Sequence, residues 1–445
     1  MTKRTLVFLI LHCTCGLAAF GQGQAFWNCG NATMTKRANL ICLLPVATQS
    51  ISSNPLAPVI NSAFATQLSQ LPTLSSGPAI AVTYDAVTGV PIVSDSLGPI
   101  LTDRAETVGK NKLLLAFGYQ HFNFNSIDGT NLNSLPFVFH TPFAANKATQ
   151  YTIENENVGM TLDQYVGVAT FGLTKKIDVS AIVPIETVNM VSHASSFNLY
   201  TIGPDNTAQG QATSVLPMVR GSASGIGDLI VNLKGVVYSG EKDTVAAGML
   251  VRFPTGDALN YLGSGAYGFN PYVVWSHPFH KVSPHVRLGY QFNTATVLIP
   301  SDPVNGTGSS TLPGGFQYNL GADVILLSGK RPLTFAGDLI GNYIVNAPVL
   351  VYKYTCLCAQ GNTASPSPYP TGIPALNPDI AVNQANPISS NYIQNSYNSD
   401  QIALGLKFKP WKNLILYGNV TFQVNNVGLR SSPVPLGGVS YTFKP

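Results

Sequence analysis

Ten ionisable side chains fall in segments where apolar and polar residues alternate, and these are the residues with which the chain could do chemistry. In such a segment one face of an extended strand carries the charges and the other face is apolar. If the apolar face contacts lipid, the charged face must meet water or find partners in an interior. We therefore interpret them as candidates to line a lumen: Asp178, Glu186, Asp228, Lys234, Arg252, His285, Arg287, Asp323, Asp338 and Lys407.

Two pairs of these residues should meet when the chain is folded about its short turns. Asp228 comes near Arg252, which predicts an ion pair. Asp323 comes near Asp338, and because two carboxylates at close range repel, they should attract a cation. The charges then either form a constriction that selects solutes by charge and size, or pair with one another without selecting anything. The strands that flank the acidic pair carry the nearest candidate cations, Arg287 and Lys407.

Catalysis and cofactor binding find little support in the sequence. A catalytic triad would require a serine, a histidine and an aspartate to meet, and no Gly-x-Ser-x-Gly motif stands between a strand and a helix. The stretch Gly263 to Gly268 matches the dinucleotide fingerprint, but that chemistry needs a helix after the glycines and here a strand pattern follows. We expect a glycine-rich loop, no cofactor and no enzyme. The histidines available to a triad are His121, His140, His193, His277, His280 and His285.

Cysteines give no metal site either. Four of the six cysteines lie beyond the first 21 residues, an even number that suits disulfides in an oxidising compartment. No histidine stands close to Cys356 and Cys358 to complete a zinc site. Cys29 and Cys42 could close a small N-terminal loop, and the connectivity is left open.

Elements that could position the charged residues are strands of period two. Between residues 244 and 253, Val245, Ala247, Met249 and Val251 fall on one face. About twelve such segments follow one another, joined alternately by short turns and long loops, which is typical of an up-and-down transmembrane β-barrel. The predicted strands are 112–124, 162–173, 177–188, 228–238, 244–253, 269–279, 284–293, 316–327, 333–345, 401–409, 414–424 and 435–443, and the longest predicted loop is 346–399.

Composition agrees with a barrel that has lipid outside and water inside. Only 10% of the 445 residues are charged, against about 25% in ordinary soluble domains. Beyond the N-terminus there is no apolar run long enough for a spanning helix. A formal net charge of +4 is too small to argue for nucleic acid. We therefore expect an all-β, antiparallel transmembrane barrel in a bacterial outer membrane.

Residues before the first strand divide into two parts. Residues 1–21 combine a basic start, an apolar core and small residues, which predicts a signal peptide. Residues 22–101 are poor in charge and show no sustained periodicity, so they could form a plug in the lumen, a periplasmic extension or a partly disordered segment. The barrel itself is expected to occupy 102–445.

Several dispersed motifs resemble a known family. The sequence resembles bacterial outer-membrane barrels named after a MetA pathway of phenol degradation, over about residues 101–443. One departure is that Lys444 and Pro445 follow Phe443, where such barrels commonly end on an aromatic residue read by the barrel-assembly machinery. The motifs are Asp103-Arg-Ala-Glu-Thr-Val-Gly109, Tyr119-Gln-His-Phe-Asn-Phe124, Ser126-Ile-Asp-Gly129, Ser224-Gly-Ile-Gly-Asp-Leu229, Arg252-Phe-Pro-Thr-Gly-Asp257, Leu262-Gly-Ser-Gly265 and Ser283-Pro-His285.

The resemblance implies a channel or transporter for small molecules, aromatic or hydrophobic compounds among them. Its partners would be outer-membrane lipid, the solute and the assembly machinery. The alternative is a structural or adhesive barrel that binds an external partner through its long loops while the N-terminal segment closes the lumen.

Overall fold

A closed, twelve-stranded antiparallel barrel is the architecture of this chain. The computed structural model describes residues 39–43, 56–71, 74–75, 82–84, 91–93, 96–143, 148–202, 208–212, 218–240, 242–299, 301, 308–354, 387–411 and 413–443. The twelve strands are β3 (Leu113–Ile127), β6 (Ala148–Gly172), β7 (Ile177–Ile202), β10 (Leu229–Ser239), β11 (Thr244–Phe253), β12 (Gly268–Ser276), β13 (Val282–Asn293), β16 (Gly315–Leu327), β17 (Leu333–Tyr354), β18 (Pro387–Trp411), β19 (Leu414–Gln423) and β21 (Val434–Phe443).

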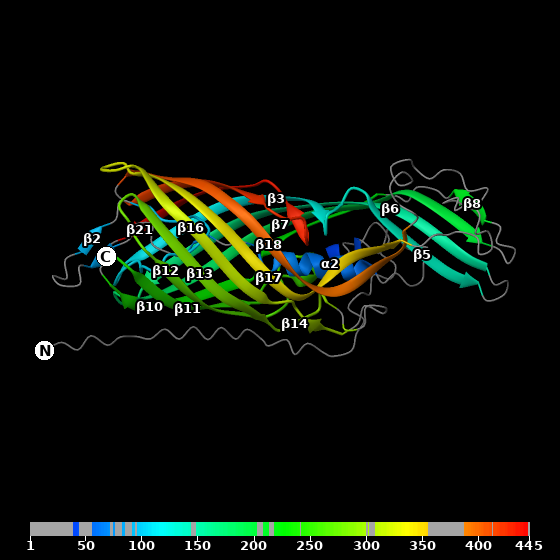
Figure 1. Ribbon diagram of the computed structural model, residues 1–445, viewed down its shortest axis with the longest axis horizontal. Coiled ribbons are helices and arrows are strands. Elements are labelled where there is room, and N and C mark those ends of the chain that lie inside the picture. Colours follow the sequence, from blue (N-terminus) through cyan, green and yellow to red (C-terminus); the bar gives the residue numbers. More distant parts are fainter. Residues whose placement is uncertain are drawn as a thin grey trace, which may run out of the picture.

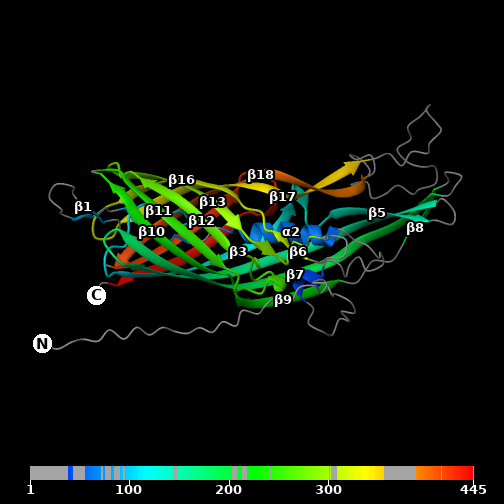
Figure 2. The ribbon, with the colours of Figure 1, turned by 90° about the horizontal axis from the view of Figure 1, so that it is seen from below.

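Each strand pairs with the next in an up-and-down order, and the barrel closes where the last strand meets the first. There β21 pairs with β3, with Phe443 opposite Leu113. Strands β10 to β13 run side by side at a common tilt (Figure 2). The predicted count, order and fold class are therefore confirmed.

The outer face of the wall is apolar and exposed. On β18, Ile402, Leu404 and Leu406 are 41%, 43% and 47% exposed, whereas Ala403 between them is fully buried. The same alternation runs along β3, where Leu115 and Phe117 are exposed. An exposed apolar band on alternate residues is the face that a barrel presents to lipid. No helix among the described residues is long and apolar enough to cross a membrane.

Several predicted loops are partly strand. β17 and β18 continue their pairing past the apolar band, from Ala347 opposite Asn395 to Tyr354 opposite Pro387, so the ends of the predicted loop 346–399 are wrong and only 355–386 lies outside the described residues. At this end of the barrel β6, with β5 and β8 beside it, extends well beyond the body of the barrel (Figure 1). The extended part of β17 reads Ala347-Pro-Val-Leu-Val351, which does not alternate between apolar and polar residues, so the period-two signal is missing there although pairing continues. The small strands are β4 (Thr130–Asn131), β5 (Leu135–Phe143), β8 (Ala208–Ala212), β9 (Val219–Ile226), β14 (Ala295–Thr296), β15 (Ser310–Thr311) and β20 (Leu429–Ser431).

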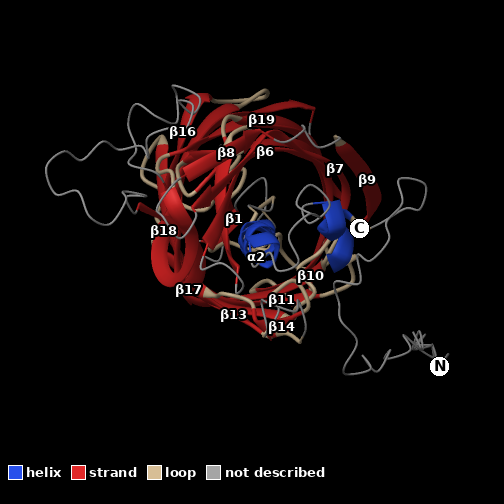
Figure 3. Ribbon diagram, turned by 90° about the vertical axis from the view of Figure 1, so that its right-hand side faces the viewer, coloured by secondary structure: helices blue, strands red, loops and turns tan. Residues whose placement is uncertain are grey.

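Part of the N-terminal region lies inside the ring of strands. Helix α2 (Leu56–Leu68) stands within the barrel (Figure 3) and contacts β17 and β20. Its Phe64 is fully buried in a core shared with wall residues of β3, β6 and β7. The helix could not be predicted from the sequence, because its buried residues 61–67 mix polar with apolar side chains and therefore show no amphipathic pattern.

Other N-terminal elements are short. They are the 3-10 helix η1 (Leu40–Cys42), which contacts a second 3-10 helix, η2 (Ala258–Asn260), and the hairpin of β1 (Val82–Tyr84) and β2 (Pro91–Val93). Cys42 is disulfide-bonded. Every other cysteine of the chain, and therefore its partner, lies outside the described residues, including Cys29, Cys356 and Cys358. The expected signal peptide, 1–21, also lies outside them.

Candidate functional site in the barrel lumen

The acidic pair predicted from the sequence has a histidine beside it. Asp323 on β16 and Asp338 on β17 lie on neighbouring strands, and His285 on β13 lies opposite Gly321. His285 Nε2 is 2.8 Å from Asp338 Oδ1, and its Nδ1 is 3.8 Å from Asp323 Oδ2. A side chain at Gly321 would overlap both His285 and Asp338, so glycine permits this contact.

The cation that binds Asp323 comes from outside the wall. Arg104 donates from Nε at 3.0 Å and from Nη2 at 2.5 Å to Asp323 Oδ2, and both side chains are almost completely buried. We expected Arg287 or Lys407 to supply this cation. That expectation is wrong, because Arg104 makes the direct contact. Arg104 precedes the first strand, so no strand register fixes its position. Its contact with Asp323 could therefore not be predicted from the sequence.

Arg104 belongs to a stretch, residues 96–108, that we call the inner segment, and buried wall residues hold it along its length. Thr102 Oγ1 is 2.9 Å from Asp338 Oδ1 and 2.8 Å from His285 Nε2. Because the hydroxyl and the carboxylate contact the same ring nitrogen, this trio lacks the geometry of a triad, which uses opposite nitrogens.

Two lysines of the wall bind the backbone of the inner segment. Lys234 Nζ donates to the carbonyl oxygens of Arg104 and Glu106, both at 2.9 Å. Lys407 Nζ donates to the carbonyl of Leu97 at 3.2 Å and to that of Pro99. These lysines are therefore backbone donors rather than partners of the acidic pair.

Acceptors of the wall hold the far end of the inner segment. Asp178 Oδ2 accepts from the Val108 amide at 2.8 Å, and Ser276 Oγ accepts from the Ala105 amide at 2.9 Å. Asp178 also lies opposite Lys234 in the pairing of β7 with β10. Six buried charged or titratable wall residues thus contact the inner segment: Asp178, Lys234, His285, Asp323, Asp338 and Lys407.

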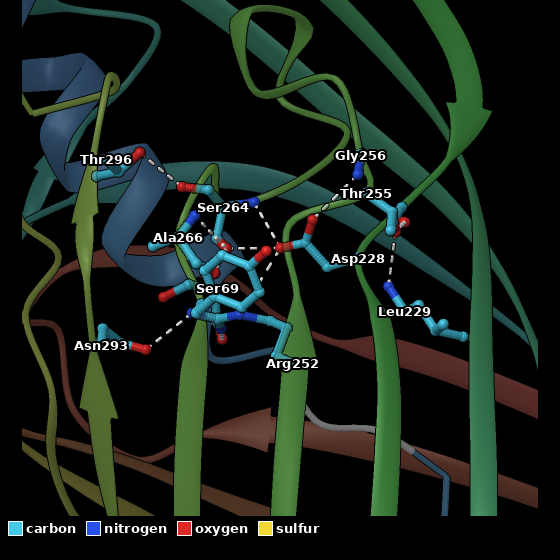
Figure 4. A network of polar contacts seen from close by, with 12 residues as sticks. Ser69, Asp228, Leu229, Arg252, Thr255, Gly256, Ser264, Ala266, Asn293 and Thr296 are labelled. Carbon is cyan, nitrogen blue, oxygen red and sulfur yellow. Dashed lines mark hydrogen bonds and ion pairs between the residues drawn. The ribbon is translucent and has the colours of Figure 1, made fainter. Parts of the chain in front are cut away.

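Asp228 and Arg252 form the predicted ion pair, with Arg252 Nε 3.7 Å from Asp228 Oδ2. Figure 4 shows this pair linking three parts of the chain. Arg252 Nη1 donates at 2.6 Å to the carbonyl of Ser69, just after α2, where a cation suits the helix dipole. Asp228 Oδ2 accepts from the Ser264 amide at 2.8 Å and thereby holds the loop between β11 and β12. That glycine-rich loop leads into strand β12, as predicted.

Glycines of the wall lie opposite bulky side chains of the N-terminal region. A Cβ added at Gly118 would be 2.7 Å from Leu74 Cδ1, and one added at Gly221 would be 2.7 Å from Leu40 Cδ2. A Cβ added at Gly405 would be 2.5 Å from Ile100 Cδ1. The wall is therefore shaped to admit these three side chains, a match that no sequence pattern revealed.

Two predicted candidates have other partners. Glu186 accepts from Gln164 Nε2 at 2.6 Å. Arg287 donates from Nη2 to Asn270 Oδ1 at 3.0 Å, and its guanidinium carbon lies 4.3 Å from the centre of the Tyr272 ring. Within the described ranges no group of three or more His, Cys, Asp or Glu residues is placed to hold a metal ion.

Comparison with known proteins agrees with the resemblance seen in the motifs. The family model described as "Putative MetA-pathway of phenol degradation" matches residues 147–309. Among solved structures, an outer membrane channel from Pseudomonas putida F1 is similar at 11% identity and a TM-score of 0.41, covering 76% of this chain and 98% of that one. The NanC porin is similar at 9% identity and a TM-score of 0.32, covering 75% of this chain and 100% of that one. No curated protein matches the sequence.

Proposed function

We propose that this chain, whose residues 147–309 match the model of that family of outer-membrane barrels, is a channel for small molecules that its own N-terminal region closes. The solutes would include aromatic or hydrophobic compounds. The plug comprises the described parts of residues 39–108, and its displacement opens the path. The chain resides in the bacterial outer membrane, with lipid around its apolar band.

The observation that carries the proposal is that six buried charged or titratable residues of the wall contact the inner segment, some of them in addition to a partner on a neighbouring strand. Here Lys234 and Lys407 donate to backbone carbonyls of a segment that is not part of the sheet. Hydrogen bonds of this kind can be exchanged for bonds to water at a net cost of only about 0.5–3 kcal/mol each, so the segment can leave without unfolding the wall.

Three cavities that the described plug residues line are small, at about 110, 60 and 20 Å³. Even the dry cavity that holds one benzene molecule is roughly 150 Å³. A solute of that size therefore fits none of these three cavities unless the N-terminal region moves.

Assembly into the membrane is part of the proposal. Tyr441 and Phe443 on β21 are exposed and in edge contact, with ring centroids 4.6 Å apart. We propose that this aromatic end of the last strand is read by the barrel-assembly machinery, two residues before the end of the sequence.

A reversible lock on the plug tests the function. A Cβ added at Gly118 would be 3.4 Å from Leu74 Cγ, the position that the sulfur of a cysteine at residue 74 would take, so two cysteines here lie within reach of a disulfide. The variant Leu74→Cys/Gly118→Cys is reconstituted in liposomes, and solute efflux is measured with and without reductant. The proposal predicts efflux only from the reduced variant, with the unmodified chain as the control for its native cysteines.

Two results would count against the proposal. Equal efflux from the oxidised and reduced variant would show that the plug does not close the path. No efflux from any form, including one that lacks residues 22–108, would favour the adhesive alternative.

A further inference from the structure

One cavity in the lumen is lined by both polar and apolar residues. It measures about 110 Å³ and lies between the end of α2, the inner segment and strands β10 to β17. Its polar lining includes Arg287 with the side-chain amides of Asn270, Asn319 and Asn342. Its apolar lining includes Leu101, Leu250 and Ile340. A ligand that fits must therefore combine a polar group with a short apolar body.

Arg287 is the group in this cavity that a ligand could satisfy. The residue is only 8% exposed, and of its guanidinium nitrogens only Nη2 has a hydrogen-bond partner among the described residues, Asn270. Asn270 and the Tyr272 ring hold the guanidinium in place. A buried donor without a partner is costly, and a guanidinium binds carboxylates through paired N–H donors.

The other charges around the cavity limit the ligand to a single negative charge. Arg252 also lines it, but Asp228, Ser69 and Asn293 already occupy that guanidinium. Asp103 places a carboxylate on the same cavity, where it accepts from Ser75 Oγ at 3.2 Å. A carboxylate ligand would be attracted by Arg287 and opposed by Asp103, and a second negative charge would meet no further cation that is not already paired.

We infer that this cavity binds a small monocarboxylate whose carboxylate pairs with Arg287 and whose apolar body lies against the leucine and isoleucine residues. The volume suits a chain of a few carbon atoms. The inference deepens the proposed channel function, because it names the solute class that pauses in the lumen on its way through.

Binding is measured on the full mature chain in detergent, by calorimetric titration with sodium butyrate at constant ionic strength. Butyramide, which has nearly the same shape and no charge, is the matched ligand. The unmodified chain should bind butyrate at least about tenfold more tightly than butyramide, because only the carboxylate pairs with the buried guanidinium.

Two variants at the cavity should change the affinity in opposite directions. Arg287→Gln should weaken butyrate binding about tenfold or more, and Asp103→Asn should strengthen it several-fold by removing the like charge. Arg331→Gln, in an exposed turn, should leave it unchanged. If Arg287→Gln does not assemble, the comparison of butyrate with butyramide and the Asp103→Asn variant decide.

Equal binding of butyrate and butyramide, or weaker binding in Asp103→Asn, would overturn the site. This failure is distinct from failure of the channel. Efflux without selective butyrate binding would refute the binding site and support the channel. Selective binding without efflux would support the binding site and refute transport.

Discussion

Arg104 and Asp323 allow the strength of plug closure to be worked out. Their side chains are 3% and 0% exposed, and Arg104 donates twice to the same carboxylate oxygen. Removing one partner of a buried ion pair costs about 3–5 kcal/mol, because the other charge stays buried and unpaired. In Arg104→Gln the closed state bears this cost, because Asp323 stays buried without its partner. Displacing the plug lets water reach Asp323 and relieves most of the cost, so the open state is favoured. At about 1.4 kcal/mol per factor of ten, the ratio of open to closed channels should rise on the order of 10²-fold or more.

The assay is the open fraction of single channels in planar bilayers, for Arg104→Gln, Asp323→Asn and the double variant. Each single variant should open the channel, and the double variant should be more closed than either single variant, because no charge is left unpaired. Arg331→Gln in an exposed turn is the control for loss of an arginine. If both single variants assemble and remain as closed as the unmodified chain, this pair does not hold the plug.

Three further predictions follow from other contacts. Gly118→Val should push Leu74 aside and raise the open fraction, whereas Gly437→Ala, which meets nothing within 4 Å, should not. Lys234→Met removes two charged hydrogen bonds and should raise the open fraction roughly tenfold or more, at about 1.5–3 kcal/mol per bond, with exposed Lys330→Met as its control. Hydrogen bonds from His277 and Trp275 hold the pKa of exposed Asp243 below its usual value. These hydrogen bonds are therefore fully present above the unfolded pKa of about 3.9, and they are lost as pH falls through the lower folded pKa. The Trp275 indole N–H resonance should shift over that range and should not shift in Asp243→Asn.

Much of the wall could be predicted from the sequence, because lipid imposes a strict alternation on every strand that crosses it. All twelve strands and the pairing of Asp228 with Arg252 follow from that alternation and from short turns that fix register. The ends of β17 and β18 could not be predicted, since residues 347–351 are apolar in succession and residues 387–399 are mostly polar, and neither run alternates.

The contents of the lumen were far less predictable. Register says nothing about residues before the first strand, so the contact of Arg104 with Asp323 was missed even though Arg104 stands in a motif that the sequence analysis had singled out. Gly118 falls within the predicted strand 112–124, and its role becomes clear only beside Leu74. The signal for the plug was indirect: residues 22–101 precede the first strand, are poor in charge and show no sustained periodicity.

The most direct test of the central claim is the single-channel conductance of the mature chain, with residues 22–108 present and then removed. Closure by the N-terminal region predicts rare, brief openings of the intact protein and a steady conductance after removal. The same steady conductance in both forms would contradict it.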